Sequence, residues 1–228
     1  AARFTTPSLS PSVISPGAPP ALNAVLGVLR APYLQRPQEG MTLVVWLTDL
    51  DKPGEVRYGL TPNSGERKYT TPRFDSALNG YVHEVILPDL SPGARHYYKV
   101  LWNAQVISEA YYDSSKQATQ PFSFIVFGDS GYGEANPSSP QMQLAQAMQT
   151  EYDARNFDLI LHTGDVVYPN GEQANYPANF FTPYSYLLSR VPAFAVLGQI
   201  DSRTERGAPF FTNFYLPKNF EGGENYYS

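Results

Sequence analysis

The sequence has no cysteine, and it has no long apolar run. The absence of cysteine excludes disulfide bonds, thiolate metal sites and a cysteine nucleophile. The most apolar uncharged stretch, residues 21–29, follows two prolines and is too short to cross a bilayer, so we expect no membrane span. Lysine and arginine form no cluster and the net charge is only −5, which argues against nucleic acid or a membrane surface as a partner.

The composition favours a folded, β-rich protein. Of 228 residues, 42% are hydrophobic, and 17 Tyr and 13 Phe stand against 2 Trp. These numbers allow a packed core in one large domain or two modest ones. The chain begins with Ala rather than Met and shows no leader pattern, and we expect a mature protein that is secreted or periplasmic. Residues 1–23 hold five prolines and several Ser and Thr, which predicts an extended arm.

Residues 24–118 carry the pattern of a small antiparallel β-sandwich. Short β-type segments alternate with turn residues, and no helical period is present. We expect strands within 42–49, 54–60, 81–90 and 95–102. The stretch LPDLSPGARHYYKV is similar to the tyrosine corner of a fibronectin type III domain. In that arrangement Leu90 enters the core, and the hydroxyl of Tyr97 or Tyr98 bonds backward to the backbone.

Residues 119–228 change to a β-α-β-α-β pattern, which predicts a parallel sheet with right-handed crossovers. The run 122–128 is nearly all apolar, as expected for a strand buried on both faces. Further strands are expected at 159–164 and 193–197. An amphipathic helix should place Leu144, Ala145, Met148 and Tyr152 on one face. A second helix, at about 182–190, has Thr182 as its expected N-cap.

Each of the three strands predicted in this half is followed by, or ends in, a glycine and then a polar residue. The pairs are Gly128-Asp129, Gly164-Asp165 and Gly198-Gln199. The pairs stand about 35 residues apart, close to one βαβ unit. Because the carboxyl ends of parallel strands share one edge of the sheet, these side chains should converge. A single Asp at such a position is usually a turn residue or helix cap. The repetition favours a metal site, and the hard oxygen ligands favour Fe, Mn, Zn or Mg.

The motifs GDSG at 128–131 and GDVVY at 164–168, together with the position of GQID at 198–201, resemble those of the metallophosphoesterase superfamily. Tyr168 narrows the resemblance to purple acid phosphatases. The resemblance covers about residues 30–228, including a fibronectin-like first half. It implies that Asp129 binds a first metal, usually Fe(III), that Asp165 bridges two metals, and that Tyr168 binds iron as phenolate. The implied cofactor is a binuclear centre of Fe with Zn, Mn or Fe, and the implied substrate is a small phosphate monoester.

The sequence departs from that family's pattern at two places. Gln199 stands where the family has a metal-binding Asn, and Ile200 replaces a His that assists catalysis, whereas Asp201 matches the acidic residue that follows. The family also takes histidine ligands from later motifs, and the chain ends at GGENYYS before them. The three histidines present, His83, His96 and His162, are not placed as substitutes. For His162 we favour support of the site loops, with an effect on a metal ligand as the alternative.

We interpret the chain as a β plus α/β protein: a fibronectin-like sandwich followed by the first half of a metallophosphoesterase domain. The expected function is metal-dependent hydrolysis of phosphate monoesters, incomplete or impaired in this chain, with a metal site that stays largely empty. One alternative is a non-catalytic binding or scaffold protein with a degenerate phosphoesterase domain. Another is a phosphodiesterase or nucleotide hydrolase, which would differ only in its pocket. An open sheet edge would also favour self-association.

Overall fold

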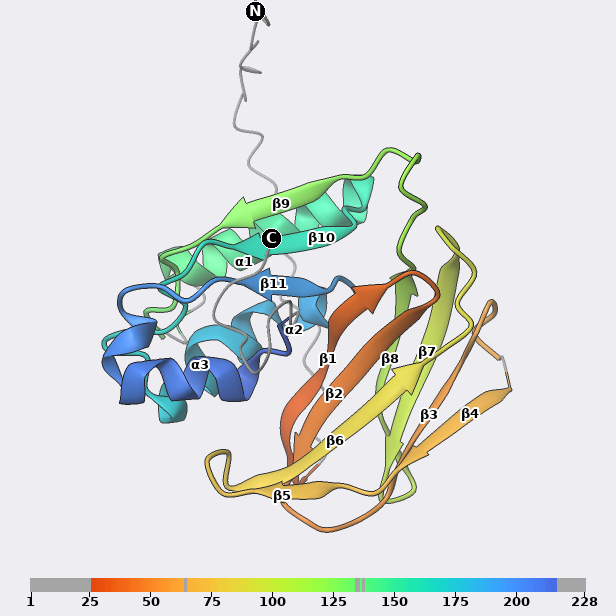
Figure 1. Ribbon diagram of the computed structural model, residues 1–228, viewed down its shortest axis with the longest axis horizontal. Coiled ribbons are helices and arrows are strands. Elements are labelled where there is room, and N and C mark those ends of the chain that lie inside the picture. Colours follow the sequence, from red (N-terminus) through yellow and green to blue (C-terminus); the bar gives the residue numbers. More distant parts are fainter. Residues whose placement is uncertain (1–25, 64, 134–135, 137, 217–228) are drawn as a thin grey trace, which may run out of the picture.

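The computed structural model describes residues 26–63, 65–133, 136 and 138–216 (Figure 1). The extended arm predicted for residues 1–23 lies outside the described residues. Within the described part, the strands of the first half pair antiparallel and those of the second half pair in parallel, as the sequence patterns predicted. The boundary near residue 118 remains a prediction, as does the correspondence to a fibronectin domain.

Two four-stranded antiparallel sheets form the first half (Figure 1). One has the order β1 (Val28–Gln38), β2 (Met41–Thr48), β6 (Gly80–Leu87), β5 (Arg73–Asp75). The other has the order β4 (Glu66–Thr70), β3 (Gly54–Gly59), β7 (Arg95–Trp102), β8 (Gln105–Asp113). Leu34, Trp46, Val56 and Val100 are among the side chains that fill the space between them, and Leu90 joins this core as expected.

Among the described residues, neither Tyr97 nor Tyr98 makes the backward hydrogen bond expected of a tyrosine corner. The hydroxyl of Tyr98 donates to the backbone carbonyl of Ser189, far along the chain. The carbonyl of Ser91 accepts instead from the hydroxyl of Ser114, and the ring of His96 lies 3.4 Å from the same oxygen. Tyr98 therefore connects the sandwich to the second half. The sequence around Tyr98 could not predict this hydrogen bond, because its acceptor lies 91 residues further along the chain.

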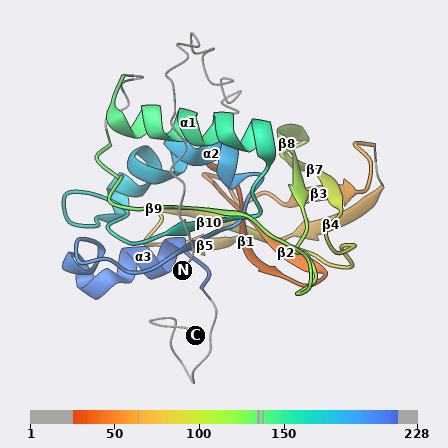
Figure 2. The same ribbon diagram turned by 90° about the horizontal axis from the view of Figure 1, so that it is seen from above.

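The second half contains the three-stranded parallel sheet β11-β10-β9. Its elements run in the order β9 (Phe124–Phe127), α1 (Pro140–Arg155), β10 (Leu159–His162), α2 (Thr182–Leu188), β11 (Ala193–Ala195), α3 (Ala208–Asn213). Short helical turns cover Gln173–Asn175, Pro177–Phe181, Asp201–Arg203 and Glu205–Gly207. Figure 2 shows α1 and α2 on one side of the parallel strands and α3 on the other.

Helix α1 agrees with its prediction, whereas the start of α2 does not. Ser139 caps α1 by accepting the N–H of Met142 at 3.3 Å, and Ala145, Met148 and Tyr152 are buried. Thr182 is not an N-cap, because the π-helical turn Pro177–Phe181 runs directly into α2. Its side chains Phe180 and Phe181 are buried in the core, and this packing extends the helical segment toward the N-terminus.

A second core lies between the outer face of the β1-β2-β6-β5 sheet and the helices. Tyr33, Val45 and Val82 from the sandwich belong to the same buried cluster as Met148 and Phe180 from the second half. Polar contacts reinforce this packing. The amide nitrogen of Gln35 donates to the carbonyl of Ala193 at 3.1 Å, and its oxygen accepts the N–H of Tyr215 at 3.0 Å. The two halves therefore stabilise one another rather than meeting only at a linker.

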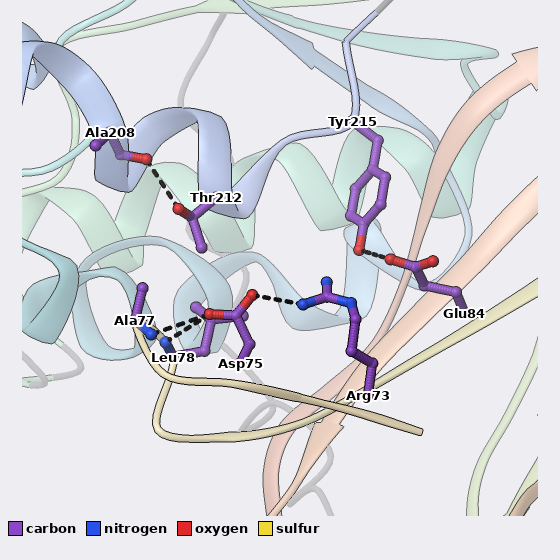
Figure 3. Close-up of polar contacts among 8 residues, drawn as sticks. All are labelled: Arg73, Asp75, Ala77, Leu78, Glu84, Ala208, Thr212 and Tyr215. Carbon is purple, nitrogen blue, oxygen red and sulfur yellow. Dashed lines mark hydrogen bonds and ion pairs between the residues drawn. The ribbon is translucent and has the colours of Figure 1, made fainter. Parts of the chain in front are cut away.

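The end of this contact surface is shown in Figure 3. The hydroxyl of Tyr215, beyond α3, donates to the carboxylate of Glu84 on β6. Nearby, Arg73 pairs with Asp75 at 3.0 Å, and the same carboxylate accepts the N–H groups of residues 77 and 78, closing the turn between β5 and β6. Thr212 donates to the carbonyl of Ala208 within α3.

The expectation that residues 122–128 form a strand buried on both faces is wrong. Ile125 and Phe127 pack against the core, but Phe124 and Val126 are each 50% exposed. The reason is that β9 is the edge strand of its sheet and that α1 and α2 pack on only one of its faces. None of the helices in the described part of the chain is long and apolar enough to cross a membrane.

Candidate metal centre

Three loops meet where the parallel strands end. The backbone N–H of Asp129, after β9, donates to the carbonyl of Gly164, after β10, at 3.1 Å. The N–H of Tyr168 donates to the carbonyl of Gly131 at 2.9 Å. The N–H of Ile200, after β11, donates to the carboxylate of Asp165 at 2.8 Å. Hydrogen bonds therefore join the three loops, whereas the convergence of the side chains of Asp129, Asp165 and Gln199 remains a prediction.

Glycine is required where these loops touch. A Cβ at position 131 would lie 1.8 Å from the carbonyl oxygen of Val166, and one at position 198 would lie 2.0 Å from the backbone nitrogen of Asp165. Neither contact is sterically allowed, so the two glycines permit the close approach that brings the site residues together.

Asp129 and Asp165 share an uncommon backbone conformation. Their φ angles are 55° and 52°, in the left-handed region that only a few per cent of non-glycine residues adopt. Asp tolerates this region better than most residues, and such strain gathers at functional sites. The loops after β9 and β10 thus begin with the same left-handed residue, and each carries a carboxylate at the same edge of the sheet.

The hydroxyl of Tyr168 donates directly to the carboxylate of Asp129. This hydrogen bond raises the pKa of Tyr168, because it favours the protonated phenol next to a negative charge. The ring of Tyr132 stacks on Tyr168 with centroids 4.1 Å apart. Asp129 and Tyr168 would hold a strong Lewis acid here, and its charge would favour the phenolate form of Tyr168.

The side chain of Asp201 connects the loop after β10 with the loop after β11. Its fully buried carboxylate accepts the N–H groups of Val166 and Val167 at 2.9 and 3.3 Å, and that of Gly198 at 3.0 Å. Burial nevertheless raises the pKa of Asp201. The sequence matched this residue to a family position but did not assign it a role, because two of its partners, Val166 and Val167, lie about 35 residues away along the chain.

His162 connects the loop after β9 with the loop after β10. Its Nδ1 accepts the N–H of Gly164 at 3.2 Å, so the ring proton is on Nε2, which lies 3.3 Å from the hydroxyl of Ser130. Burial lowers the pKa of His162 to about 4, so the ring is neutral at pH 7. Because Ser130 follows Asp129 and Gly164 precedes Asp165, His162 fits the loop-supporting role proposed from the sequence.

The side chains of Gln199 and Ile200 differ in their exposure to solvent. Gln199 is exposed, whereas Ile200 is buried with 7% of its surface accessible. Ile200 contributes its backbone N–H to Asp165 and not its side chain. The position at which the resemblance places a catalytic His is therefore occupied by a residue that packs into the protein.

The residues present fit one hard cation better than a pair of metals. Asp129 and Tyr168 bring two oxygen donors into contact, which suits Fe(III) or a similar ion. A second ion would have only Asp165, whose carboxylate already accepts a backbone N–H, and the exposed Gln199. Across the described residues, no group of three or more His, Cys, Asp or Glu side chains is placed to hold a metal ion.

Comparisons with known proteins agree with the sequence motifs. No family model matches the chain. Two proteins of Arabidopsis thaliana are similar in sequence. "Probable inactive purple acid phosphatase 1" is 27% identical over 167 residues, which cover 60% of this chain and 27% of the relative. "Probable inactive purple acid phosphatase 27" is 28% identical over 158 residues, covering 64% and 25%. The chain thus spans about a quarter of the length of these curated relatives.

Solved structures show the same architecture at lower identity. The purple acid phosphatase PPD1 from yellow lupin (Lupinus luteus) seeds superposes with a TM-score of 0.64 at 22% identity, covering 84% of this chain and 42% of that one. PhoD superposes with a TM-score of 0.60 at 10% identity, covering 79% and 40%. The chain has a purple acid phosphatase-like metallophosphoesterase fold.

Proposed function

We propose that this chain is the N-terminal part of a purple acid phosphatase-like, metal-dependent phosphomonoester hydrolase, and that its catalysis is impaired. The observation that carries the proposal is the direct contact between the Tyr168 hydroxyl and the Asp129 carboxylate. Tyr186 and Tyr215 make similar contacts to carboxylates elsewhere, but the contact of Tyr168 joins the loops after β9 and β10, which carry the two GD motifs. The small phosphate ester as substrate and the secreted or periplasmic location belong to the same proposal.

The remaining residues have separable tasks. Asp129 and Tyr168 would hold a first hard cation, with Asp165 on the adjacent loop, and Asp201 and His162 keep the loops in register. When bound, metal ions in such sites supply Lewis-acid stabilisation to the phosphoryl oxygens. The tyrosine proton must leave for Tyr168 to act as a phenolate ligand, and its raised pKa opposes that step unless a cation compensates.

Impairment follows from residues 199 and 200. Ile200 can neither transfer a proton nor donate a side-chain hydrogen bond, and it is buried. Gln199 is one methylene longer than Asn, which moves its amide oxygen by about 1.5 Å. Loss of one positioned electrostatic donor typically costs about 10²–10³ in rate. The two substitutions affect the second metal and the leaving group, so both reduce the rate of the hydrolysis step.

Turnover of an aryl phosphate by the purified chain tests this proposal. With added Fe, Zn or Mn at pH 5–7, we expect negligible hydrolysis, little bound iron and no purple colour. Asp165→Asn should leave this background unchanged, as should the matched surface change Asp153→Asn. Robust hydrolysis that Asp165→Asn abolishes and Asp153→Asn does not would contradict impairment.

A non-catalytic binding or scaffold role is the second candidate. The burial of Ile200 favours it, as does the word "inactive" in the names of the relatives. Paramagnetic Mn²⁺ separates the two candidates, because it broadens NMR signals near even a weak site. Broadening confined to the loops of Asp129 and Asp165, and lost in Tyr168→Phe, supports a residual metal site. Absence of such broadening favours the scaffold role.

A further inference from the structure

A cavity of about 330 Å³ opens beside the candidate metal centre, between the loop after β9 and the first turns of α1. The lining residues are Gly128, Asp129, Ser130, Tyr132, Ser139, Pro140, Gln141 and Leu144. Its volume is at the lower end of the range for small-molecule sites. Because Asp129 forms part of the wall, anything bound in the cavity would lie against the candidate metal centre.

The polar side chains of the wall are turned to internal partners. Gln141 accepts the N–H of Gly133 at 3.1 Å and donates to the carbonyl of Asn179. Ser139 accepts the N–H of Met142 as the cap of α1, and Ser130 pairs with His162. These bonds engage Gln141, Ser139 and Ser130 within the protein, so the carboxylate of Asp129 is the main polar group of the wall that faces a ligand.

The remaining wall is apolar and aromatic. Leu144 is only partly buried, and Pro140 and Tyr132 are exposed. The Tyr132 ring lines the cavity and stacks on the ring of Tyr168, which restrains it. Aromatic ligands gain from stacking on such a ring in addition to the burial of apolar area.

The charge of the residues that line the cavity indicates which part of a phosphate ester would bind in it. None of the lining residues described here is Lys or Arg, and the carboxylate of Asp129 is negative. A phosphate group would be repelled without a cation, so the cavity itself suits a neutral group. The geometry points to the organic part of the ester, with the phosphate directed at the metal centre.

We propose that this cavity binds the aromatic alcohol portion of a phosphate ester, so that the substrate class is aryl phosphates rather than sugar or polyol phosphates. The assignment rests on the proposed function for the position of the phosphate. It does not depend on turnover, because recognition of the aromatic group needs neither metal nor catalysis.

Binding of 2-naphthol to the metal-free full chain, followed by NMR shift mapping, tests the proposal. We expect saturable shifts at residues lining the cavity and none with glycerol. Tyr132→Ala should weaken binding roughly three- to tenfold, because one stacking contact is lost. Tyr69→Ala is the matched control: Tyr69 is 67% exposed on β4, against 61% for Tyr132, and lies far from the cavity along the chain.

Leu144→Asn provides a second variant, which places an amide in the apolar wall and should also weaken binding. Equal 2-naphthol affinity in Tyr132→Ala, Leu144→Asn and Tyr69→Ala would overturn the proposal, as would shifts located elsewhere or an equal response to glycerol. The proposed function fails by a different result, robust turnover or absence of any metal response, so the two failures are distinguishable.

Discussion

His83 is a buried histidine with a single described polar partner. Its Nε2 lies 2.9 Å from the Thr48 hydroxyl, and its ring stacks on Trp46 with centroids 4.6 Å apart. Nδ1 is buried and has no hydrogen-bond partner among the described residues. Burial lowers the pKa of His83 to about 4, so the folded protein keeps this ring neutral at pH values where an unfolded chain protonates it.

The stability of the protein should therefore fall on acidification. Between about pH 6.5 and pH 4 the unfolded state binds a proton that the folded state does not, so the free energy of unfolding decreases as the pH falls through this window. For His83 the loss is about 3 kcal/mol, and His162 adds a loss of the same sign. Urea denaturation at several pH values measures it.

His83→Gln is the test variant for this prediction. Gln can retain a hydrogen bond to Thr48 but does not titrate. The variant should be less stable at pH 7 because the stack on Trp46 is lost, and its stability should depend less steeply on pH between 6.5 and 4. An unchanged slope would show that His83 is not the titrating group.

At the scale of elements, the parallel strands end in loops that Asp201 ties together. Replacement by Asn keeps the size but puts an N–H₂ group where one carboxylate oxygen accepts backbone N–H groups. We expect Asp201→Asn to lower the free energy of unfolding by about 1–3 kcal/mol, because a buried donor loses its acceptor. Thermal or urea unfolding measures the change.

Asp153→Asn is the matched control for that change. Asp153 accepts a hydrogen bond from the Tyr186 hydroxyl at 2.6 Å, but it is exposed on α1. Surface changes of this kind usually stay within about 0.5 kcal/mol. Equal effects of the two substitutions would mean that Asp201 does not hold the loops.

At the scale of the whole molecule, the described residues cover only part of the face of the parallel sheet on the side of α3. The strand register places Phe124, Val126, Leu159, Leu161 and Phe194 on the same face. Phe124 and Val126 are half exposed, and the other three are only partly buried. Contiguous exposed apolar surface commonly marks an interface or an aggregation hazard, and here it adjoins the edge strand β9.

We expect the chain to associate through this face and edge. Sedimentation velocity should show an average mass that rises with concentration, and Phe124→Lys should shift it toward the monomer by placing a charge on the face. Phe74→Lys is the matched control, since Phe74 is 54% exposed on β5 in the other half. A monomer at all concentrations, or equal effects of the two variants, would contradict the prediction.

The sequence by itself determined the antiparallel and parallel halves, the three strand ends and the identity of the residues Asp129, Asp165 and Tyr168. These features depend on local periodicity and on glycine-polar pairs, which a one-dimensional pattern records. Their role as metal ligands remains a proposal from resemblance, which the contact between Tyr168 and Asp129 supports.

Only the tertiary structure decided which side chains are covered and by what. It buried Ile200, placed Asp201 beneath two loops, left one face of β9 exposed, joined Tyr98 to Ser189 and began the helical segment before Thr182. Each of these outcomes depends on a partner or neighbour brought close by folding, from another loop, another helix or the opposite half of the molecule. Local periodicity shows which face of an element is apolar, but it does not show which distant element will cover that face.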